Sequence, residues 1–312
     1  MPEQNYDIIG DIHGHADELA LLLNKLGYSW IDGCYRHSER RVIFLGDFID
    51  RGPKQREVLQ TVIPMVQQGS ALAVMGNHEF NALAFHTQHP ELAGNWLRPR
   101  NNKNIQQHLR FLDEYVSNQE ELANVLEFFF SLPLWLDLGG LRVVHACWEP
   151  RHVEYLGNEG LLTPDNLMTQ ELLVKANNKG SPEYDAIEAL LKGVEYELPP
   201  GEFFRDKDGH NRTAVRTRWW TNEDCFLRDV ALPPGVLDDT TGKLEILGSE
   251  LVGYPPSEKP VFIGHYWLKG IPERLAENVA CIDYSVAKGG KLVAYRWEGE
   301  NQLYDENFIY VS

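Results

Sequence analysis

Gly46-Asp47-Phe48-Ile49-Asp50-Arg51-Gly52 is the middle part of a three-part pattern that decides the fold of this 312-residue chain. Gly10-Asp11-Ile12-His13-Gly14 precedes it and Gly76-Asn77-His78-Glu79 follows it. Each part comes directly after an apolar run, and apolar residues at helical spacing come after it, so the pattern predicts strand, polar turn and helix in succession. Active-site groups of α/β proteins lie at the carboxyl ends of strands, where these three turns stand.

The expected elements alternate along the first third of the chain. Strands are predicted at 6–9, 42–45 and 71–75, and helices at 16–26, 56–68 and 79–86. Two later apolar runs, residues 141–144 and 261–264, are followed by His145 and His265. Five strand ends would therefore converge on one pocket.

The side chains in these turns suit divalent metal ions. Asp11 and His13 offer a carboxylate and an imidazole two positions apart, so both can reach one ion as the backbone turns. A carboxylate at Asp47 can bridge two ions, and Asn77 offers an amide oxygen without adding charge. Mixed nitrogen and oxygen ligands suit borderline cations, and two-metal hydrolases hold their ions roughly 3.5–4 Å apart. The three motifs together predict a two-metal phosphoesterase site.

Each of these residues also has a purely structural interpretation. A histidine after a strand, such as His145 or His265, is most often a buried, hydrogen-bonded residue, and Gly-Asp-x-His-Gly alone could be a turn. The three motifs in this order favour the metal site, because chance seldom produces all of them in one chain.

The chain resembles the calcineurin-like metallophosphoesterases, and within them the phosphoprotein phosphatase branch, whose three motifs it matches without a gap. The resemblance implies two ligand sets that share Asp47: Asp11, His13 and Asp47 for the first ion, and Asp47, Asn77, His145 and His265 for the second. The cofactors expected are two divalent transition-metal ions. Mn²⁺ is the preferred expectation, and Fe, Co and Zn are the alternatives.

The same resemblance assigns catalytic roles. His78 is the general acid that protonates the leaving group, Asp50 orients it, and Arg51 and Asn77 bind the phosphate. The chemistry agrees with these roles. Two divalent ions lower the pKa of a shared water, so that hydroxide can attack phosphorus directly. A histidine held by a carboxylate can supply a proton near neutral pH, and the planar guanidinium of Arg51 can bind a phosphate through two parallel donors.

A second arginine clamp is expected between residues 212 and 220. Phosphatases of the branch use an arginine from this part of the chain, and Arg216 and Arg218 share one face at strand spacing. The sequence leaves open which of the two it is. The structural alternative is a basic edge strand whose tryptophans pack inward.

We expect one domain over residues 1–312, because the site residues run from residue 11 to residue 265 and the site closes only when most of the chain has folded. The resemblance implies an α/β fold, a four-layer sandwich of two mixed β-sheets flanked by helices. Helical patterns at about 86–137 and 149–210 are interpreted as cap-like insertions over the metal pocket, the second with a turn-rich segment at 206–209.

The last third of the chain alternates apolar and polar residues. This period of two is typical of half-buried strands. We expect a second sheet, closed by short turns, from segments 279–284, 291–297 and 308–311.

Composition limits the partners. The formal net charge of −17 argues against a general nucleic-acid-binding protein, whereas two ions and two arginines can attract a phosphorylated substrate locally. Four separated cysteines form no Cys-x-x-Cys pair, so a disulfide scaffold is not expected. The amino terminus lacks the regions of a signal peptide, and no apolar stretch is long enough for a membrane helix. The expectation is a soluble cytoplasmic protein that acts on a phosphorylated small molecule or a phosphoprotein.

Departures from the branch pattern bear on the substrate. Ser/Thr phosphatases usually have Arg at the position of Met75 and Gly-Gly after the metal-binding histidine, whereas this chain has His145-Ala146-Cys147-Trp148-Glu149-Pro150. The latter is similar to the symmetrical diadenosine tetraphosphatases, although Glu79 and Cys147 differ from that group. Dinucleoside polyphosphates are therefore slightly favoured. A Ser/Thr or broad-specificity phosphoprotein phosphatase is the alternative, and a catalytically silent metal-binding regulatory module is the second alternative.

Overall fold

The computed structural model describes residues 5–205, 211–238 and 241–312. The chain forms two compact units: Met1–Leu191 with Lys259–Ser312 is the first, and Lys192–Glu258 is the second. The expected insertion at 149–210 is thus divided between the two units, and its role as a cap stays a prediction. The predicted turn at 206–209 lies outside the described residues.

The first sheet of the first unit carries the three motifs. Its order is β17-β18-β1-β4-β5, with β19 paired to β18. The strands are β1 (Asn5–Ile9), β4 (Arg40–Phe44), β5 (Ala71–Ala73), β17 (Asp283–Tyr284), β18 (Lys291–Trp297) and β19 (Phe308–Val311). β1, β4 and β5 are parallel, so their carboxyl ends meet at one edge. The sheet is mixed, because β18 is antiparallel to β1.

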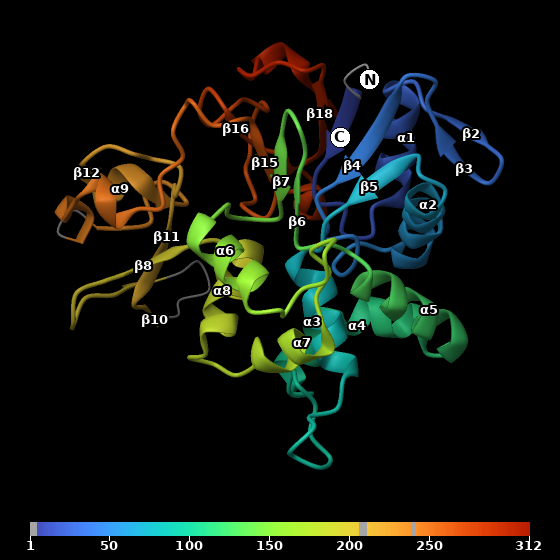
Figure 1. The fold of residues 1–312 in the computed structure, drawn as a ribbon, viewed down its shortest axis with the longest axis horizontal. Helices are drawn as coiled ribbons and strands as arrows, with labels where there is room; N and C mark the ends of the chain where they lie inside the picture. Colours follow the sequence, from blue (N-terminus) through green and yellow to red (C-terminus); the bar gives the residue numbers. More distant parts are fainter. Residues whose placement is uncertain (1–4, 206–210, 239–240) are drawn as a thin grey trace. The chain divides into compact units, whose positions relative to one another are not determined.

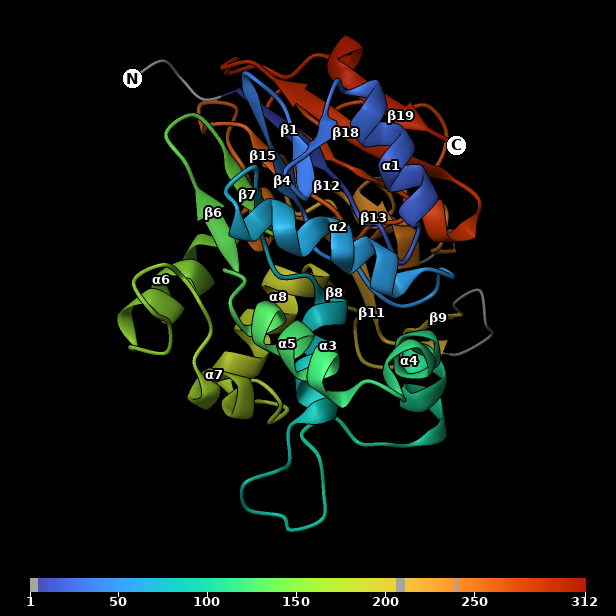
Figure 2. The same cartoon turned by 90° about the vertical axis from the view of Figure 1, so that its right-hand side faces the viewer.

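Two helices and a hairpin accompany this sheet. Figure 2 shows α1 (Ala16–Lys25) and α2 (Gln55–Gln67) on one face of the sheet. The apolar stripe predicted for the first helix is the face that packs, since Leu19, Leu22 and Leu23 are buried. The hairpin between α1 and β4 consists of β2 (Ser29–Ile31) and β3 (Cys34–Arg36).

The second sheet supplies the two later histidines. Its order is β16-β15-β7-β6. The strands are β6 (Trp135–Asp137), β7 (Arg142–Val144), β15 (Val261–Ile263) and β16 (Val279–Cys281). β15 is parallel to β7 and β16, and β6 is antiparallel to β7. Side chains of both sheets share one core, in which Ile8 and Ile43 of the first sheet lie with Val143 and Phe262 of the second.

The predicted composition of the second sheet was wrong. Segments 291–297 and 308–311 form strands, but β18 pairs with β1 and β19 pairs with β18, all in the first sheet. Only β16, from the start of the predicted segment 279–284, belongs to the second sheet. The period of two identifies a strand but not its partner, which lies more than 280 residues away for β18.

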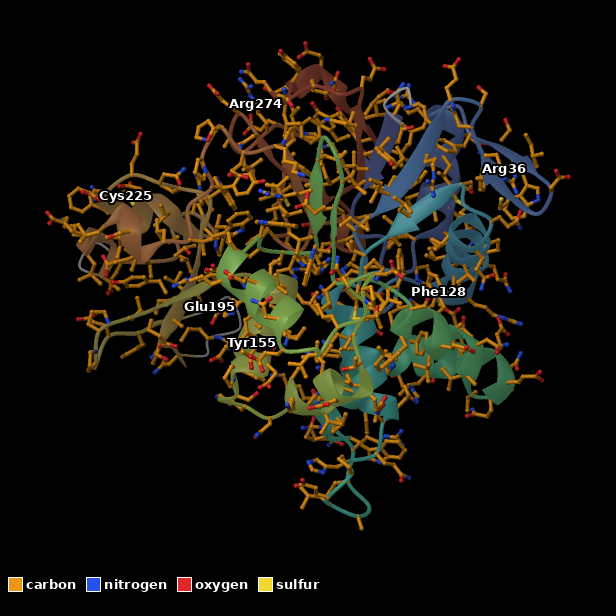
Figure 3. All side chains as sticks on the ribbon, in the orientation of Figure 1. Arg36, Phe128, Tyr155, Glu195, Cys225 and Arg274 are labelled. Atoms are coloured by element: carbon orange, nitrogen blue, oxygen red, sulfur yellow. The ribbon has the colours of Figure 1, made fainter. Side chains whose placement is uncertain are left out.

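Helices α3 (Asn77–His86), α4 (Asn102–Tyr115) and α5 (Gln119–Phe130) lie together in the teal and green part of Figure 1, and α5 contacts the other two. Phe128 of α5, labelled in Figure 3, packs against Phe48 of the middle motif with ring centroids 6.4 Å apart. Three more helices follow β7: α6 (Pro150–Asn158), α7 (Gln170–Lys175) and α8 (Pro182–Lys192). Within the described ranges, no helix has both the length and the apolar character needed to span a bilayer.

The second unit has its own small core, which includes Val215, Leu227 and Ile246. Its elements are β8 (Glu195–Glu197), β9 (Phe204–Arg205), β10 (Asn211–Arg212), β11 (Ala214–Thr217), β12 (Cys225–Phe226), α9 (Leu227–Val230), β13 (Ala231–Leu232) and β14 (Glu245–Ile246). Short 3₁₀ turns complete the two units at η1 (Thr241–Lys243), η2 (Gly248–Glu250), η3 (Val286–Lys288) and η4 (Asp305–Asn307).

Candidate metal centre

The backbone around the motifs is strained where the candidate ligands stand. Nine described residues other than glycine have a positive φ, and five of them are candidate site residues: His13, Asp47, Asp50, Arg51 and His265. Such conformations are uncommon for side-chain-bearing residues and concentrate at functional sites. A Cβ at Gly46 would overlap the backbone of Gly76, and a Cβ at Gly76 would overlap Asp47. Glycine at both positions lets the second and third motifs touch.

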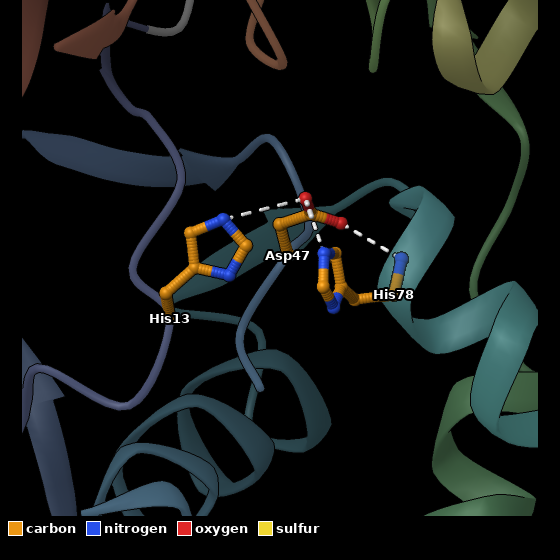
Figure 4. A group of neighbouring side chains, drawn as sticks. All are labelled: His13, Asp47 and His78. Carbon is orange, nitrogen blue, oxygen red and sulfur yellow. Dashed lines mark hydrogen bonds and ion pairs between the residues drawn. The ribbon is translucent and has the colours of Figure 1, made fainter. Parts of the chain in front are cut away.

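Asp47 is the centre of the cluster. One carboxylate oxygen lies 3.6 Å from Nε2 of His13, and the other lies 3.5 Å from Nε2 of His145. Figure 4 shows Asp47 between His13 and His78, whose backbone N–H donates to Asp47 over 2.9 Å. Two groups could each hold a metal ion: His13, Asp47 and His78, and Asp47, His145 and His265. Asp47 is common to both groups, as a bridging ligand must be.

Two histidines present the nitrogen that a metal would need. Nδ1 of His13 donates to the carbonyl of Ile49 over 2.9 Å, and Nδ1 of His145 donates to the carbonyl of Leu45 over 2.7 Å. These bonds leave Nε2 of each ring facing Asp47. Nε2 of His13 is buried and makes no hydrogen bond to any residue in the described ranges. Burial lowers the pKa of His13 to about 3, so its imidazole is neutral, which is the form that binds metal.

Asn77, His265 and Asp11 complete the cluster. The side-chain oxygen of Asn77 lies 2.8 Å from Nδ1 of His265 and 3.2 Å from Nε2 of His145. The backbone N–H of His265 donates to Asp11 over 3.1 Å. Burial and the neighbouring charge of Asp283 raise the pKa of Asp11 well above its usual range. Buried carboxylates that repel one another need cations, so the donors present fit divalent ions.

His78, Asp50 and Arg51 lie together beside this cluster. Nδ1 of His78 donates to Asp50 over 2.5 Å. Burial alone would lower the pKa of His78, but Asp47 and Asp50 raise it above its usual value. Arg51 places Nη2 3.3 Å from Nε2 of His78, and its guanidinium lies 3.8 Å above the ring of Trp267. A guanidinium beside Nε2 would repel a metal ion there.

The sequence did not single out two residues that support these groups. Nδ1 of His108, on α4, donates to the second oxygen of Asp50 over 2.8 Å. Glu79 was noted only as a departure, yet its carboxylate accepts from the backbone N–H groups of Asp47, Phe48 and Gly76 over 2.7–3.0 Å. Glu79 could have been recognised from its position as the third residue of the helix α3, because a glutamate there can cap the start of the helix. His108 follows no motif, and no signal in one sequence identified it.

The two arginines expected as a second clamp lie in the second unit. Arg216 belongs to β11, and its Nε is 3.8 Å from a carboxylate oxygen of Glu195. Arg218 follows β11, and its backbone N–H donates to Val230 over 2.7 Å. Their role in binding phosphate stays a prediction.

Known proteins similar to this chain share the motif region. The model of the calcineurin-like phosphoesterase family matches residues 5–192. The chain is 51% identical over 74 residues to bis(5'-nucleosyl)-tetraphosphatase PrpE (asymmetrical) of Anoxybacillus flavithermus, a match that covers 23% of this chain and 30% of the relative. It is 30% identical over 185 residues to the protein of the same name in Oceanobacillus iheyensis, covering 56% of this chain and 68% of the relative. The first match thus spans under a third of the relative's length.

Solved structures support the fold. A protein serine/threonine phosphatase from Saccharomyces cerevisiae aligns with a TM-score of 0.53 and 14% identity, covering 100% of this chain and 80% of that one. A cold-active protein tyrosine phosphatase aligns with a TM-score of 0.51 and 18% identity, covering 98% and 78%. They confirm the predicted α/β class with two mixed sheets. Because the family model matches more than half of the sequence, the chain belongs to the calcineurin-like phosphoesterase family.

Proposed function

We propose that the chain is a two-metal phosphoesterase that cleaves the phosphoanhydride of dinucleoside polyphosphates by direct attack of hydroxide. The observation that carries the proposal is the position of Asp47, whose two oxygens face His13 and His145 in two separate ligand groups. The substrate class is supported by the relatives, which are named bis(5'-nucleosyl)-tetraphosphatases.

The ligand sets remain those expected from the motifs. Asp11, His13 and Asp47 would hold one ion, and Asp47, Asn77, His145 and His265 would hold the other. When bound, two divalent ions would supply hydroxide near neutral pH and screen the charge of the phosphoryl oxygens. The mixed nitrogen and oxygen donors support Mn²⁺, with Fe, Co and Zn as alternatives.

Arg51 and His78 act in sequence in this proposal. In the structure Nη2 of Arg51 lies 3.3 Å from Nε2 of His78, the nitrogen that would give a proton to the leaving group. A phosphate draws the guanidinium to itself through paired hydrogen bonds. The imidazole already holds its proton, because Asp47 and Asp50 raise the pKa of His78, and with Arg51 on the phosphate Nε2 faces the leaving group. The proton passes to the leaving group as the phosphoanhydride breaks.

The N-terminus of α3 adds to phosphate binding. Asn77 and His78 are its first two residues, and the positive end of a helix dipole attracts anions. The backbone N–H of His78 already donates to Asp47. Asn77 is therefore placed to serve both as a ligand and as a donor to phosphate.

A cytoplasmic location is part of the proposal and is supported by four cysteines that are all free thiols.

The test uses diadenosine tetraphosphate with the purified chain and Mn²⁺. The relatives' names specify asymmetrical enzymes, so the expected products are ATP and AMP, whereas symmetrical cleavage would give two ADP. A phosphoserine peptide is assayed in parallel. Turnover of the peptide without cleavage of the dinucleotide would reject the substrate class and favour the phosphoprotein phosphatase alternative.

A further inference from the structure

Arg98 is a partly buried cation near the metal centre that lacks an acidic partner. Its guanidinium donates to the side-chain oxygens of Asn81 and Gln107, the latter over 2.9 Å. Among the residues that the structure describes, it makes no ion pair, and Asp50 and Glu188 act on it only at longer range. Burying a cation without a counterion is unfavourable. An anion from outside the chain would complete the arrangement.

One face of α3 connects the metal centre to this arginine. His78, Asn81 and Phe85 are spaced three and seven residues apart, so they lie on the same side of the helix. At a rise of 1.5 Å per residue, Asn81 is roughly 4.5 Å and Phe85 roughly 10.5 Å beyond His78 along the axis. Arg98 is bound at Asn81, and Arg100 donates to the carbonyl of Phe85 over 3.1 Å. Two cations thus follow His78 along the helix.

A cavity of about 380 Å³ opens where this face ends. Its walls include Phe85, Phe111 and Tyr115, and the positive charge at its edge is Arg100. The volume lies in the range of small-molecule sites. Aromatic walls of this kind stack planar heterocycles.

Two buried polar atoms stand unpaired at the cavity. Nε2 of His86 and the hydroxyl of Tyr115 make no hydrogen bond to any described residue, and both residues line the cavity. Tyr115 is only 1% exposed, and an unpaired hydroxyl at such depth is costly. A ligand with both an aromatic face and hydrogen-bonding edges would satisfy the walls and these atoms together.

We infer that Arg98 and this cavity bind the part of the dinucleotide that lies beyond the reacting phosphate. Arg98 holds a phosphate further along the chain, and the cavity holds a purine base, with Arg100 between them. This inference rests on the proposed function for its substrate class. In this inference, residues outside the three motifs select a substrate that is long enough to reach Arg98 and the cavity.

The experiment measures binding by calorimetry in a His78→Asn background, which keeps the ligand residues but removes the general acid. Diadenosine tetraphosphate, inorganic tripolyphosphate and inorganic phosphate are titrated in the presence of Mn²⁺. Arg98→Gln should weaken the first two about tenfold and leave inorganic phosphate unchanged. Val116→Trp partly fills the cavity from a position that is 71% exposed, so the fold is preserved. It should weaken only the dinucleotide, again about tenfold.

Arg110→Gln is the matched control, because Arg110 is an exposed arginine of α4 that does not line the cavity. It should bind all three ligands normally. Arg98→Lys separates charge from geometry and should restore part of the affinity for tripolyphosphate. Unchanged dinucleotide affinity in both Arg98→Gln and Val116→Trp overturns the inference, as does an equal loss for inorganic phosphate. Hydrolysis by the unsubstituted chain is measured separately, so failure of the proposed function shows as absent dinucleotide cleavage with binding intact.

Discussion

His108 and Asp50 form a buried hydrogen bond of 2.8 Å between Nδ1 of the histidine and one carboxylate oxygen. The other oxygen of Asp50 binds His78. Asp50 is therefore held from two sides, and its carboxylate cannot turn without breaking a bond. The stack of His108 on Phe111, with ring centroids 4.7 Å apart, fixes the imidazole in turn. We therefore expect His108 to act through Asp50 as a positioning residue for the proposed general acid.

Replacing His108 with Phe should slow turnover while leaving both ions bound. A hydrogen bond to a charged group contributes roughly 1.5–3 kcal/mol, which corresponds to a loss of about 10- to 100-fold. Gln at this position can still donate to Asp50 and should recover part of the rate. The measurement is kcat with an alkyl phosphate, together with metal content. A Phe variant with normal kcat would leave His108 with a packing role only.

His78→Asn should keep both ions and slow turnover by about 10²–10⁴. The loss should depend on the leaving group, because p-nitrophenolate departs without much help and an alkoxide does not. Asp50→Asn should show the same selectivity more mildly, since Asp50 only orients the imidazole and supports its charge. His78 could instead be a ligand, because it lies in one of the two potential metal groups. Loss of an ion in His78→Asn would establish that role and remove it as the acid.

The motif residues could be predicted because their information is local. Asp47 and Asn77 each follow a short apolar run, and parallel strands bring their carboxyl ends to one edge whatever the rest of the chain does. The helix after the third motif begins at Asn77, two residues earlier than expected, because Glu79 caps the backbone N–H of Gly76. The expected ligand residues could be chosen from the sequence because the strand and the turn were each identifiable alone, and their role as ligands stays a prediction.

Long-range contacts could not be read in this way. His108 is one polar residue on an amphipathic helix, and its partner Asp50 is 58 residues away. The pairing of β18 with β1 depends equally on the folded chain, because an alternating pattern fits either sheet. That Arg98 forms no ion pair with any described residue depends on its surroundings in the fold and has no sequence signature.

The bridge role of Asp47 predicts a joint loss of both ions. Asp47→Asn removes the charge that faces His13 and His145, so metal content and rate should fall together. Asp11→Asn is the comparison, since Asp11 is expected at one ion only and should leave the second site filled. Elemental analysis after gel filtration gives the ion count per chain. Two ions and normal turnover in Asp47→Asn would show that the bridge assignment is wrong.

Acid should destabilise the fold through His86. Burial, together with the electrostatic influence of His108 and Arg100, lowers the pKa of His86 to about 4, from a value near 6.5 in the unfolded chain. As the pH falls, His86 is therefore protonated in the unfolded state before it is protonated in the folded state. Its contribution to the free energy of unfolding is complete above pH 6.5 and is lost as the pH falls toward 4. The loss is about 1–2 kcal/mol, because the partly exposed ring is screened by water. His86→Gln should flatten the slope of the unfolding free energy between pH 6.5 and 4, measured by urea denaturation. Above pH 7 the unfolding free energies of the unsubstituted chain and of His86→Gln should change in parallel, since His86 is neutral in both states there. An unchanged slope below pH 6.5 in His86→Gln would assign the acid sensitivity to other groups.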